Sequence, residues 1–268
     1  MPASTSASSS SRPTLTIGVL TLNEAHCIRA CLKSAAFADQ VLVVDSGSRD
    51  GTVEIAQSMG AEVHIYPDWQ GFAVQRNRLL QHASGDYIFF LDADEVMPPD
   101  FQAALQKIVA SQEQAVWQIR WRMVAFGKEL KHFRSNSWIE RLFVRQQLQG
   151  FTGVVHEQAQ LATPNMPRHK IQPPLLHHSR HSVQASLEKL TQYAVLGAAK
   201  RAEKGKRGGV LRGLASGGSM FLRLYILHLG FLSGGAGFLY CLFVALEAFF
   251  RYAALGYDAN IQSNIKRN

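Results

Sequence analysis

Four short apolar runs in the first hundred residues predict β-strands. They are rich in β-branched and aromatic residues, are bounded by polar turns, and lie at residues 15–20, 41–45, 62–66 and 87–92. Helical patterns separate these runs, at residues 25–36, 52–59 and 72–83. Because strands that alternate with helices build a sheet covered on both faces, the pattern predicts an α/β fold with a mainly parallel sheet.

The pattern changes after this region. A helix is expected from Pro98 to about residue 109, because proline suits a first helical turn. Further strands are predicted at residues 116–126, 139–144 and 154–161. A proline-rich loop is predicted at 163–174, and an apolar stripe at helical spacing predicts a long helix at 182–204.

The last fifty residues predict association with a membrane. Residues 229–246 carry no charge, and this run of eighteen is at the short limit of what can cross a hydrocarbon core of about 30 Å. Residues 211–227 are amphipathic, with basic side chains on the polar side. We therefore expect a pair of helices at the membrane interface. A single span within residues 224–250 and a hydrophobic hairpin buried in the core both stay open at this point.

Net charge is distributed unevenly along the chain. Residues 1–117 carry 7 basic and 13 acidic side chains, a net charge of −6, whereas residues 118–268 carry 21 basic and 7 acidic ones, a net charge of +14. This asymmetry indicates that the second part faces an anionic partner. Because the basic residues form no nucleic-acid-binding motif, we expect no nucleic acid and favour a membrane surface or a phosphorylated substrate.

Polar residues follow three of the predicted strands at the point where each strand ends. They are Thr21-Leu22-Asn23-Glu24, Asp45-Ser46-Gly47-Ser48 and Asp92-Ala93-Asp94-Glu95. Ligands of open α/β sheets bind outside the carboxyl ends of the strands, so we expect these three clusters to meet at one binding edge.

Asp92 and Asp94 are the candidate metal ligands. Residues two apart on a strand point to the same side, and carboxylates suit Mg²⁺ or Mn²⁺, which often bind one or two carboxylates together with substrate phosphates. The alternative is a solvated acidic turn before the helix that starts near Pro98. Asp45 is a candidate acceptor for a ribose hydroxyl or a base N–H, or else part of an Asp/Ser turn. A dinucleotide-binding site is excluded, because no Gly-x-Gly-x-x-Gly follows the first strand.

The ordered set of motifs resembles the inverting family 2 glycosyltransferases, and within them a bacterial branch that includes lipopolysaccharide-core glucosyltransferases. The resemblance covers about residues 14–255. It is carried by the three clusters above and by the following segments: Gly71-Phe72, Gln75-Arg76-Asn77, Arg141-Leu142-Phe143, Val155-His156-Glu157, Leu175-Leu176-His177-His178-Ser179, Tyr225-Ile226 and Gly230-Phe231-Leu232.

This resemblance implies a GT-A fold, a nucleotide-diphospho-sugar donor such as UDP-glucose, and a divalent metal. It implies that Thr21, Glu24 and Asp45 hold the nucleoside, with Arg76 near the base or diphosphate. Asp92 would lie near the ribose and the metal, and Asp94 would ligate the metal. Their neighbours Asn23, Ser46 and Gly47 complete the expected donor-binding set.

The acceptor side is predicted from the chemistry of an inverting transfer. The acceptor hydroxyl needs a general base on the opposite face of the sugar, and Glu157 is the candidate, with His156 as a second base or an extra metal ligand. Trp138, Arg141 and Arg145 precede this segment and are candidate acceptor-binding residues, because arginine binds phosphate with two parallel hydrogen bonds. The alternative for these residues is a sheet edge with exposed basic side chains.

These observations predict an enzyme that transfers a sugar to a hydroxyl of a glycolipid or lipopolysaccharide-core saccharide at the cytoplasmic face of a bacterial inner membrane. A polyprenyl-phosphate acceptor and a non-catalytic membrane-bound module are the alternatives. The expected division of the chain is a disordered serine-rich leader at 1–13, a GT-A catalytic domain at 14–180, membrane-associated helices at 181–257 and a tail at 258–268.

Overall fold

The structure, a computed structural model, describes residues 12–133, 137–153 and 157–258. The chain divides into two compact units. Unit 1 comprises Met1–Arg120 and Ser137–Leu175, and unit 2 comprises Trp121–Asn136 and Leu176–Asn268. The segment 121–136, which was expected to lie within one catalytic domain, thus belongs to the same unit as the C-terminal helices.

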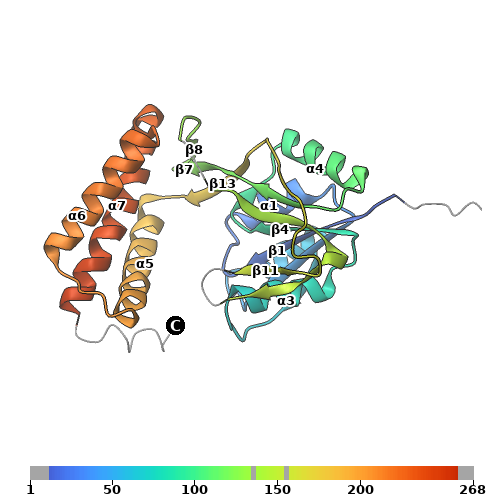
Figure 1. Ribbon diagram of the computed structural model, residues 1–268, viewed down its shortest axis with the longest axis horizontal. Helices are drawn as coiled ribbons and strands as arrows, with labels where there is room; N and C mark the ends of the chain where they lie inside the picture. Colours follow the sequence, from blue (N-terminus) through green and yellow to red (C-terminus); the bar gives the residue numbers. More distant parts are fainter. Residues whose placement is uncertain (1–11, 134–136, 154–156, 259–268) are drawn as a thin grey trace, which may run out of the picture. The chain divides into compact units, whose positions relative to one another are not determined.

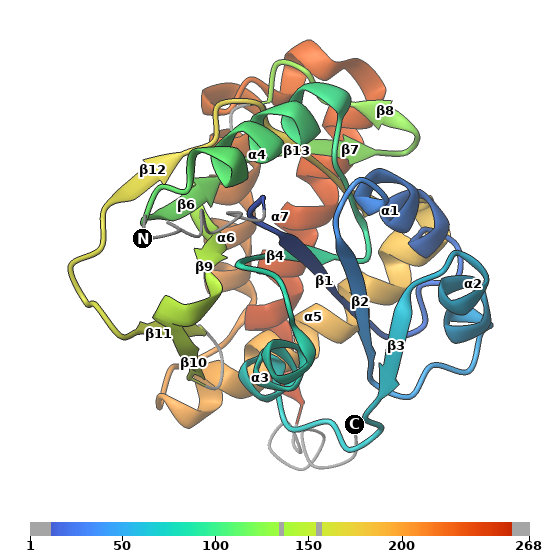
Figure 2. The ribbon, with the colours of Figure 1, turned by 90° about the vertical axis from the view of Figure 1, so that its right-hand side faces the viewer.

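Unit 1 is built around a sheet that, over the described residues, has seven strands in the order β12-β6-β9-β4-β1-β2-β3 (Figure 2). The strands are β1 (Leu15–Thr21), β2 (Gln40–Asp45), β3 (Glu62–Ile65), β4 (Tyr87–Asp92), β6 (Val116–Ile119), β9 (Ile139–Val144) and β12 (Arg168–Lys170). Strands β1 to β4 run parallel, whereas β9 is antiparallel to both β4 and β6. The predicted α/β fold with a mainly parallel sheet is confirmed.

Helices and a hairpin cover the two faces of this sheet. They are α1 (Ile28–Ala35), α2 (Thr52–Ser58), α3 (Phe72–His82), α4 (Pro99–Ser111) and the hairpin of β10 (Leu148–Thr152) and β11 (Gln158–Leu161). Adjacent residues of β4 point to opposite faces. The ring of Phe89 lies 5.7 Å from that of Phe101 on α4, and the ring of Phe90 lies 4.9 Å from that of Phe151 on β10.

Helix α3 covers the same face as Phe90. Gly18 of β1 pairs with Phe90 in register, and a Cβ at Gly18 would lie 2.1 Å from Cδ2 of Leu79 on α3. Because glycine has no Cβ, the helix approaches the central strand closely. The residues of α3 are thereby brought over the carboxyl half of β1 and β4.

Two predictions about the second half were wrong. Residues 116–126, expected as one strand, form β6 and β7 (Trp121–Ala125), which are separated at Arg120 and belong to different sheets. The predicted loop at 163–174 contains β12, which pairs in parallel with β6. All three residues of β12 are exposed and polar, so this edge strand is held by backbone hydrogen bonds and has no apolar pattern to reveal it. Of the predicted strand at 154–161, β11 forms from Gln158 onward, and residues 154–156 lie outside the described residues.

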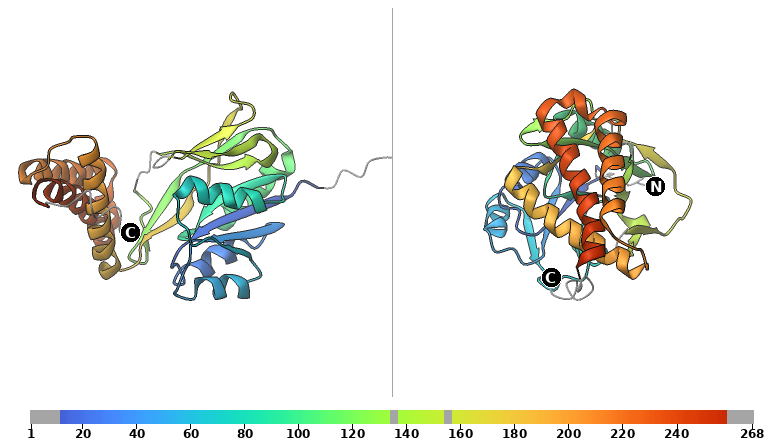
Figure 3. Two further views of the ribbon diagram at one scale, coloured as in Figure 1. Left: turned by 90° about the horizontal axis from the view of Figure 1, so that it is seen from below. Right: turned by 90° about the vertical axis from the view of Figure 1, so that its left-hand side faces the viewer.

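Unit 2 contains β7, β8 (Lys128–Glu129) and β13 (Leu175–Arg180), with β7 hydrogen-bonded to both of the others. Its helical part consists of α5 (Val183–Glu203), α6 (Val210–Leu222), the π-helical turn η2 (Arg223–Leu227), the 3₁₀ turn η3 (Gly230–Ser233) and α7 (Gly234–Tyr257). The three α-helices lie side by side (Figure 1), and α7 packs against both α5 and α6 (Figure 3).

Helices α6 and α7 approach each other at glycines. A Cβ at Gly213 would lie 2.9 Å from the carbonyl oxygen of Phe249, and one at Gly217 would lie 3.0 Å from the carbonyl oxygen of Ala245. Close backbone approach through small residues is typical of helix packing in membranes. The segment Gly230–Tyr257 is long and apolar enough to cross a membrane, with a mean hydropathy of 1.6, although core helices of soluble proteins pass the same test.

One face of α7 contacts the strands β7 and β13 of unit 2 and the residue that follows β7. Nη2 of Arg180, at the end of β13, lies 2.5 Å from Oε1 of Glu247 in α7, and both residues are buried. The Phe243 ring lies 6.1 Å from that of Phe126, which follows β7. The middle of the most apolar helix is therefore bound to a strand by a buried ion pair.

Candidate active site

The three polar clusters meet at the carboxyl edge of the sheet in unit 1. Thr21 pairs with Asp45 across β1 and β2, and Leu20 pairs with Asp92 across β1 and β4. Because these three strands are parallel neighbours, the loops that follow them leave the sheet side by side. The structure thus brings together the residues from which the sequence predicts donor binding.

The Asp45 side chain organises the loop after β2. It is fully buried, and its Oδ1 accepts hydrogen bonds of 2.8 Å from the backbone N–H groups of Gly47 and Ser48. Gly47 has φ +96°, a conformation that residues with a Cβ rarely adopt. The Ser48 hydroxyl donates to Asp45 and accepts from the backbone N–H of Asn23 at 2.7 Å, which joins this loop to the one after β1.

Thr21 and Glu24 lie in the loop after β1. Thr21 is 5% exposed, and within the described part of the chain its hydroxyl has no hydrogen-bond partner. Buried hydroxyls almost always have a partner, so this one is suited to bind a ligand atom. The backbone N–H of Glu24 donates to the Thr52 hydroxyl at 2.8 Å, which fixes the start of α1 relative to α2.

Three consecutive residues of α3 reach in different directions. Nε2 of Gln75 donates to the Ser46 hydroxyl at 2.8 Å, and Gln75 is 1% exposed. The Asn77 amide exchanges two hydrogen bonds with the backbone of Phe151, at 2.7 and 3.0 Å. Helix α3 is thus fixed to the loop after β2 on one side and to β10 on the other, and Arg76 is held between these two contacts.

Arg76 places a desolvated cation at this edge. Its guanidinium carbon lies 5.5 Å from the ring centre of Phe90 and 5.4 Å from that of Phe151, and within the described residues its buried Nε has no hydrogen-bond partner. Burial, followed by repulsion from Arg141, lowers the pKa of Arg76, and the Glu157 carboxylate acts in the opposite direction. A cation with so little solvation binds an anion strongly.

Arg141 of β9 forms a buried ion pair with two carboxylates of the β4 end. It is 2% exposed, and its guanidinium contacts both oxygens of Asp92, at 3.1 and 2.5 Å, and Oε1 of Glu95 at 3.1 Å. Glu95 is 0% exposed and accepts the backbone N–H of Asp92 at 2.9 Å. Burial acts to lower the pKa of Arg141. The charges of Asp92 and Glu95 act in the opposite direction and outweigh burial, so the pKa lies above its usual range. Arg141, predicted to bind the acceptor, thus contacts Asp92 and Glu95, and Glu95 is the member of the third cluster to which the sequence assigns no role of its own.

Asp94 and Glu157 are the other two acidic residues predicted for this site, and the charge of Asp94 acts on Arg141. Strand β4 ends at Asp92, so Asp94 lies in the following turn, and strand alternation is not what determines where its carboxylate points. Both Asp94 and Glu157 are partly buried, and the charge of Glu157 acts to raise the pKa of Arg76. His156, the second candidate base, lies outside the described residues.

The other two candidate acceptor residues are far apart. Arg145 donates through Nε to the carbonyl of Gly85 at 2.6 Å, and its backbone N–H donates to the carbonyl of Asp86 at 2.8 Å. Asp86 precedes β4, so Arg145 lies about 20 Å from the Asp92 end at about 3.3 Å per residue. Trp138 precedes β9 and therefore lies at the Asp92 end. The structure keeps Trp138 with the site and separates Arg145 from it.

A second group of potential metal ligands lies on β3 and at the end of α3. Glu62, His64 and His82 have ligand atoms within 4.8 Å of one another, and the two imidazole rings stack at 3.5 Å. Nε2 of His64 contacts Oε1 of Glu62 at 2.8 Å, and Nε2 of His82 contacts the Tyr66 hydroxyl at 2.7 Å. Glu62 begins β3, so this group extends toward the opposite edge from Asp94.

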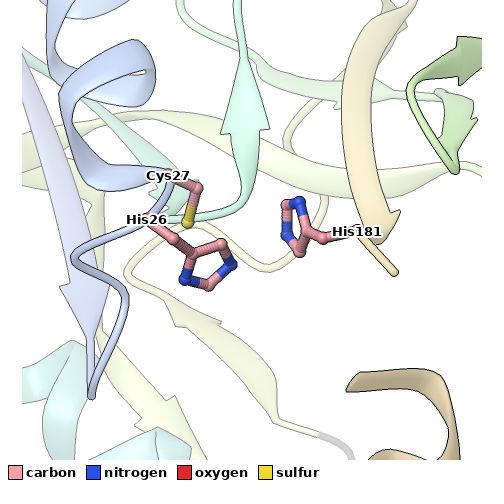
Figure 4. A group of neighbouring side chains, drawn as sticks. All are labelled: His26, Cys27 and His181. Carbon is pink, nitrogen blue, oxygen red and sulfur yellow. The ribbon is translucent and has the colours of Figure 1, made fainter. Parts of the chain in front are cut away.

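The cysteines near the site are packing residues. Figure 4 shows His26 and Cys27 in the turn before α1 in unit 1, and His181, which follows β13 in unit 2. Cys27 and Cys31 are both buried, and Sγ of Cys31 lies 3.6 Å from the carbonyl oxygen of Asp92. Burial raises the pKa of the Cys31 thiol, which disfavours the thiolate that redox chemistry needs.

An α/β unit with a mainly parallel sheet, a short acidic motif after β4 and polar loops after β1 and β2 defines the GT-A class of sugar transferases. Residues 16–163, more than half of the chain, match glycosyl transferase family 2. The chain belongs to this family, and the enzyme class, fold and family that the sequence predicts are confirmed.

The chain is also similar to individual glycosyltransferases. The chain is 25% identical over 244 residues to the lipopolysaccharide core biosynthesis glycosyltransferase LpsC of Rhizobium meliloti, across 88% of this chain and 90% of LpsC. It is 36% identical over 126 residues to an uncharacterized glycosyltransferase of Rickettsia bellii, of which the match covers 40%. The crystal structure of S. aureus TarS 1-349 in complex with UDP-GlcNAc is similar with a TM-score of 0.48 and 17% identity, over 63% of this chain and 59% of that one.

Proposed function

We propose that this chain transfers a sugar from a nucleotide-diphospho-sugar to a hydroxyl of a lipopolysaccharide-core or related glycolipid acceptor, with inversion at the anomeric carbon. The observation that carries the proposal is the meeting of Thr21, Asp45 and the Asp92–Asp94 turn at one edge beside the cation Arg76. The similarity to LpsC along nearly the whole of both chains supports the acceptor class. UDP-glucose is the donor to test first.

The loops after β1 and β2 would hold the nucleoside. The hydroxyl of Thr21 is buried without a partner among the described residues, so a ligand hydrogen bond there would remove an existing cost. Asp45 fixes the adjacent loop through its hydrogen bonds to residues 47 and 48, which shapes the wall against which a ribose would lie. Binding therefore uses a preformed surface.

The carboxylates at the end of β4 suit a divalent cation that is bound together with the diphosphate of a nucleotide-sugar. Asp92 ends β4, and Asp94 follows it in a turn where its side chain is partly exposed. We assign ligation of Mg²⁺ or Mn²⁺ to Asp94, and to Asp92, which contacts Arg141 through both oxygens, a position beside the metal. When bound, the cation would supply charge stabilisation to the departing diphosphate.

Arg76 and Glu157 would act on opposite sides of the reaction. The desolvated guanidinium of Arg76 is placed to stabilise negative charge on the leaving group. The Glu157 carboxylate would accept the proton of the acceptor hydroxyl. A polyprenyl-phosphate acceptor needs no such base because its phosphate oxygen is already ionised, so the dependence of turnover on Glu157 distinguishes the two acceptors.

We further propose that unit 2 binds an anionic membrane surface from the cytoplasmic side without crossing it. Apolar side chains of α6 and η2 are exposed, with Leu211 82%, Leu222 61% and Leu227 69% exposed, and Arg212 and Arg223 lie among them. Such a mixture of exposed leucines and arginines is typical of helices that lie in the lipid headgroup region.

The experiment measures nucleotide release by the full-length protein from a panel of nucleotide sugars, with Mg²⁺, with Mn²⁺ and with a chelator. We expect metal-dependent release from one donor, a loss of at least about 100-fold in Asp94→Asn, and wild-type rates in Asp100→Asn, an exposed aspartate six residues further along. Equal thermal unfolding of both variants excludes misfolding. Full metal-dependent turnover by Asp94→Asn would overturn the metal assignment, and a wild-type protein that neither binds nor cleaves any donor would favour a non-catalytic module.

A further inference from the structure

Three side chains gather where β6, β9 and β12 reach the edge of the sheet. The guanidinium carbon of Arg120, directly after β6, lies 5.7 Å from the ring centre of Trp138, directly before β9. Nζ of Lys170, the last residue of β12, lies 4.9 Å from the same ring centre. Trp138 therefore holds two cations close together through cation–π contacts.

The strand register places this group at the same edge as the metal-binding turn. Strand β9 is antiparallel to β4, and its first residue, Ile139, pairs with Ile119 at the end of β6. Strand β12 runs parallel to β6, so Lys170 lies at that edge too. Neighbouring strands are about 4.8 Å apart, so the group extends from about 5 to about 15 Å from β4, on the side away from β1 and β2.

Arg120 and Lys170 have no carboxylate partner among the residues that the structure describes. In the described part of the chain no ion pair involves Arg120 or Lys170, and the polar contact of Arg120 is a 3.5 Å approach to the carbonyl of Gln172. By contrast, Arg168, two residues before Lys170 on β12, pairs with Glu140 at 2.8 Å. An anion placed near both cations would be attracted by both and would offset the repulsion between them.

We propose that Arg120 and Lys170 bind a negatively charged substituent of the acceptor saccharide, a phosphate or a carboxylate, and that Trp138 is their positioning residue. This inference rests on the proposed function, because the acceptor must reach the Asp94 turn from a side the donor does not fill. It assigns to Arg120 and Lys170 the role that the sequence suggests for Arg141 and Arg145. The subsite makes the enzyme select an anionic over a neutral acceptor.

The test is calorimetric binding of four probes to the full-length protein with UDP and Mg²⁺ present: glucose 6-phosphate, glucuronate, glucose and inorganic phosphate. We expect at least one of the two anionic sugars to bind at least about tenfold more tightly than glucose and than inorganic phosphate. Arg120→Met and Lys170→Met should each weaken that binding about tenfold, and Trp138→Leu should weaken it as well. Lys107→Met, an exposed lysine on α4, is the matched control and should bind like the wild type. The comparison of phosphate with carboxylate identifies the charged group.

Three results would overturn the inference: no binding of either anionic sugar, equal binding by Arg120→Met, Lys170→Met and the control, or inorganic phosphate binding as tightly as the sugars. Donor cleavage and UDP affinity are measured in the same variants and should be unchanged. Loss of UDP binding would show instead that these cations serve the donor. A wild-type protein that neither binds nor cleaves any donor refutes the proposed function, whereas intact donor cleavage without anionic-sugar binding refutes only the subsite.

Discussion

Replacing Arg141 by Met should destabilise unit 1 severely. The substitution keeps most of the side-chain volume but removes the guanidinium that contacts Glu95, which is 0% exposed. Breaking a buried ion pair by removing one partner costs about 3–5 kcal/mol. Asp92 is 38% exposed and can be rehydrated, so most of the loss comes from Glu95. At roughly 2–4 °C per kcal/mol, the melting temperature should fall by about 6 to 20 °C.

The assay is thermal unfolding followed by tryptophan fluorescence, with two comparison variants. Arg168→Met removes an arginine from an ion pair with Glu140 in which both side chains are partly exposed, and it should cost less than about 1 kcal/mol. Adding Glu95→Gln to Arg141→Met should restore most of the lost stability, because the fully buried side chain at position 95 is then uncharged. A melting temperature for Arg141→Met no lower than that of Arg168→Met, or no recovery in the double variant, would refute this reasoning.

Three further substitutions test the other parts of the proposal. Glu157→Gln should lower kcat with a hydroxyl acceptor at least about 100-fold and leave the affinity for UDP unchanged in calorimetry, since only proton removal is lost. Asp86→Asn should cost less than about 1 kcal/mol at pH 7, because the backbone and side-chain hydrogen bonds from Thr14 lower the pKa of the Asp86 carboxyl. A carboxyl whose pKa is lower in the folded than in the unfolded chain stabilises the fold at any pH above the pKa of the unfolded chain. In urea unfolding, the difference in stability between Asp86→Asn and the wild type should therefore vanish as the pH falls through the lowered pKa of the folded protein. Leu214→Gln, at a position 57% exposed on α6, should weaken flotation with anionic vesicles, whereas Leu187→Gln, 52% exposed on α5, should not.

The sequence predicts the first half of unit 1 well because its strands are buried. Ile17, Val19 and Leu42 are completely buried. Because a buried strand needs apolar side chains, β1 and β2 appear in the sequence as apolar runs. The carboxyl ends of parallel strands then share one edge whatever the side-chain details, and the three polar clusters follow from this topology. Strand β12 has no such signal, because an exposed edge strand is selected for backbone pairing and not for apolar side chains.

The roles of the arginines on β9 and the turn after it depend on register, which the sequence does not contain. Pairing of Phe89 with Leu142 sets Arg141 opposite Phe90, beside the end of β4, and sets Arg145 beside the start of that strand. The local sequence pattern does not distinguish the role of Arg141 from that of Arg145. Only a contact between segments about fifty residues apart in the chain separates a residue that supports Asp92 from one that fixes a loop at the other end of the sheet.

A long-range contact of the same kind supports our proposal that unit 2 lies on a membrane without crossing it. By composition α7 could cross a bilayer, but Glu247, beyond its middle, is buried against Arg180 of β13, and Phe243 stacks on that guanidinium at 5.3 Å. A helix that spanned the membrane would carry this ion pair and the attached strand into the hydrocarbon, where charged groups are costly. Exposed leucines also occur on α5 and η3, but four of them, Leu211, Leu214, Leu222 and Leu227, lie on α6 and η2, which pack against α7. The ion pair of Glu247 and the exposed leucines of α6 and η2 are therefore the reasons for our proposal that α6 and η2 face the lipid and that unit 2 lies on the membrane without crossing it.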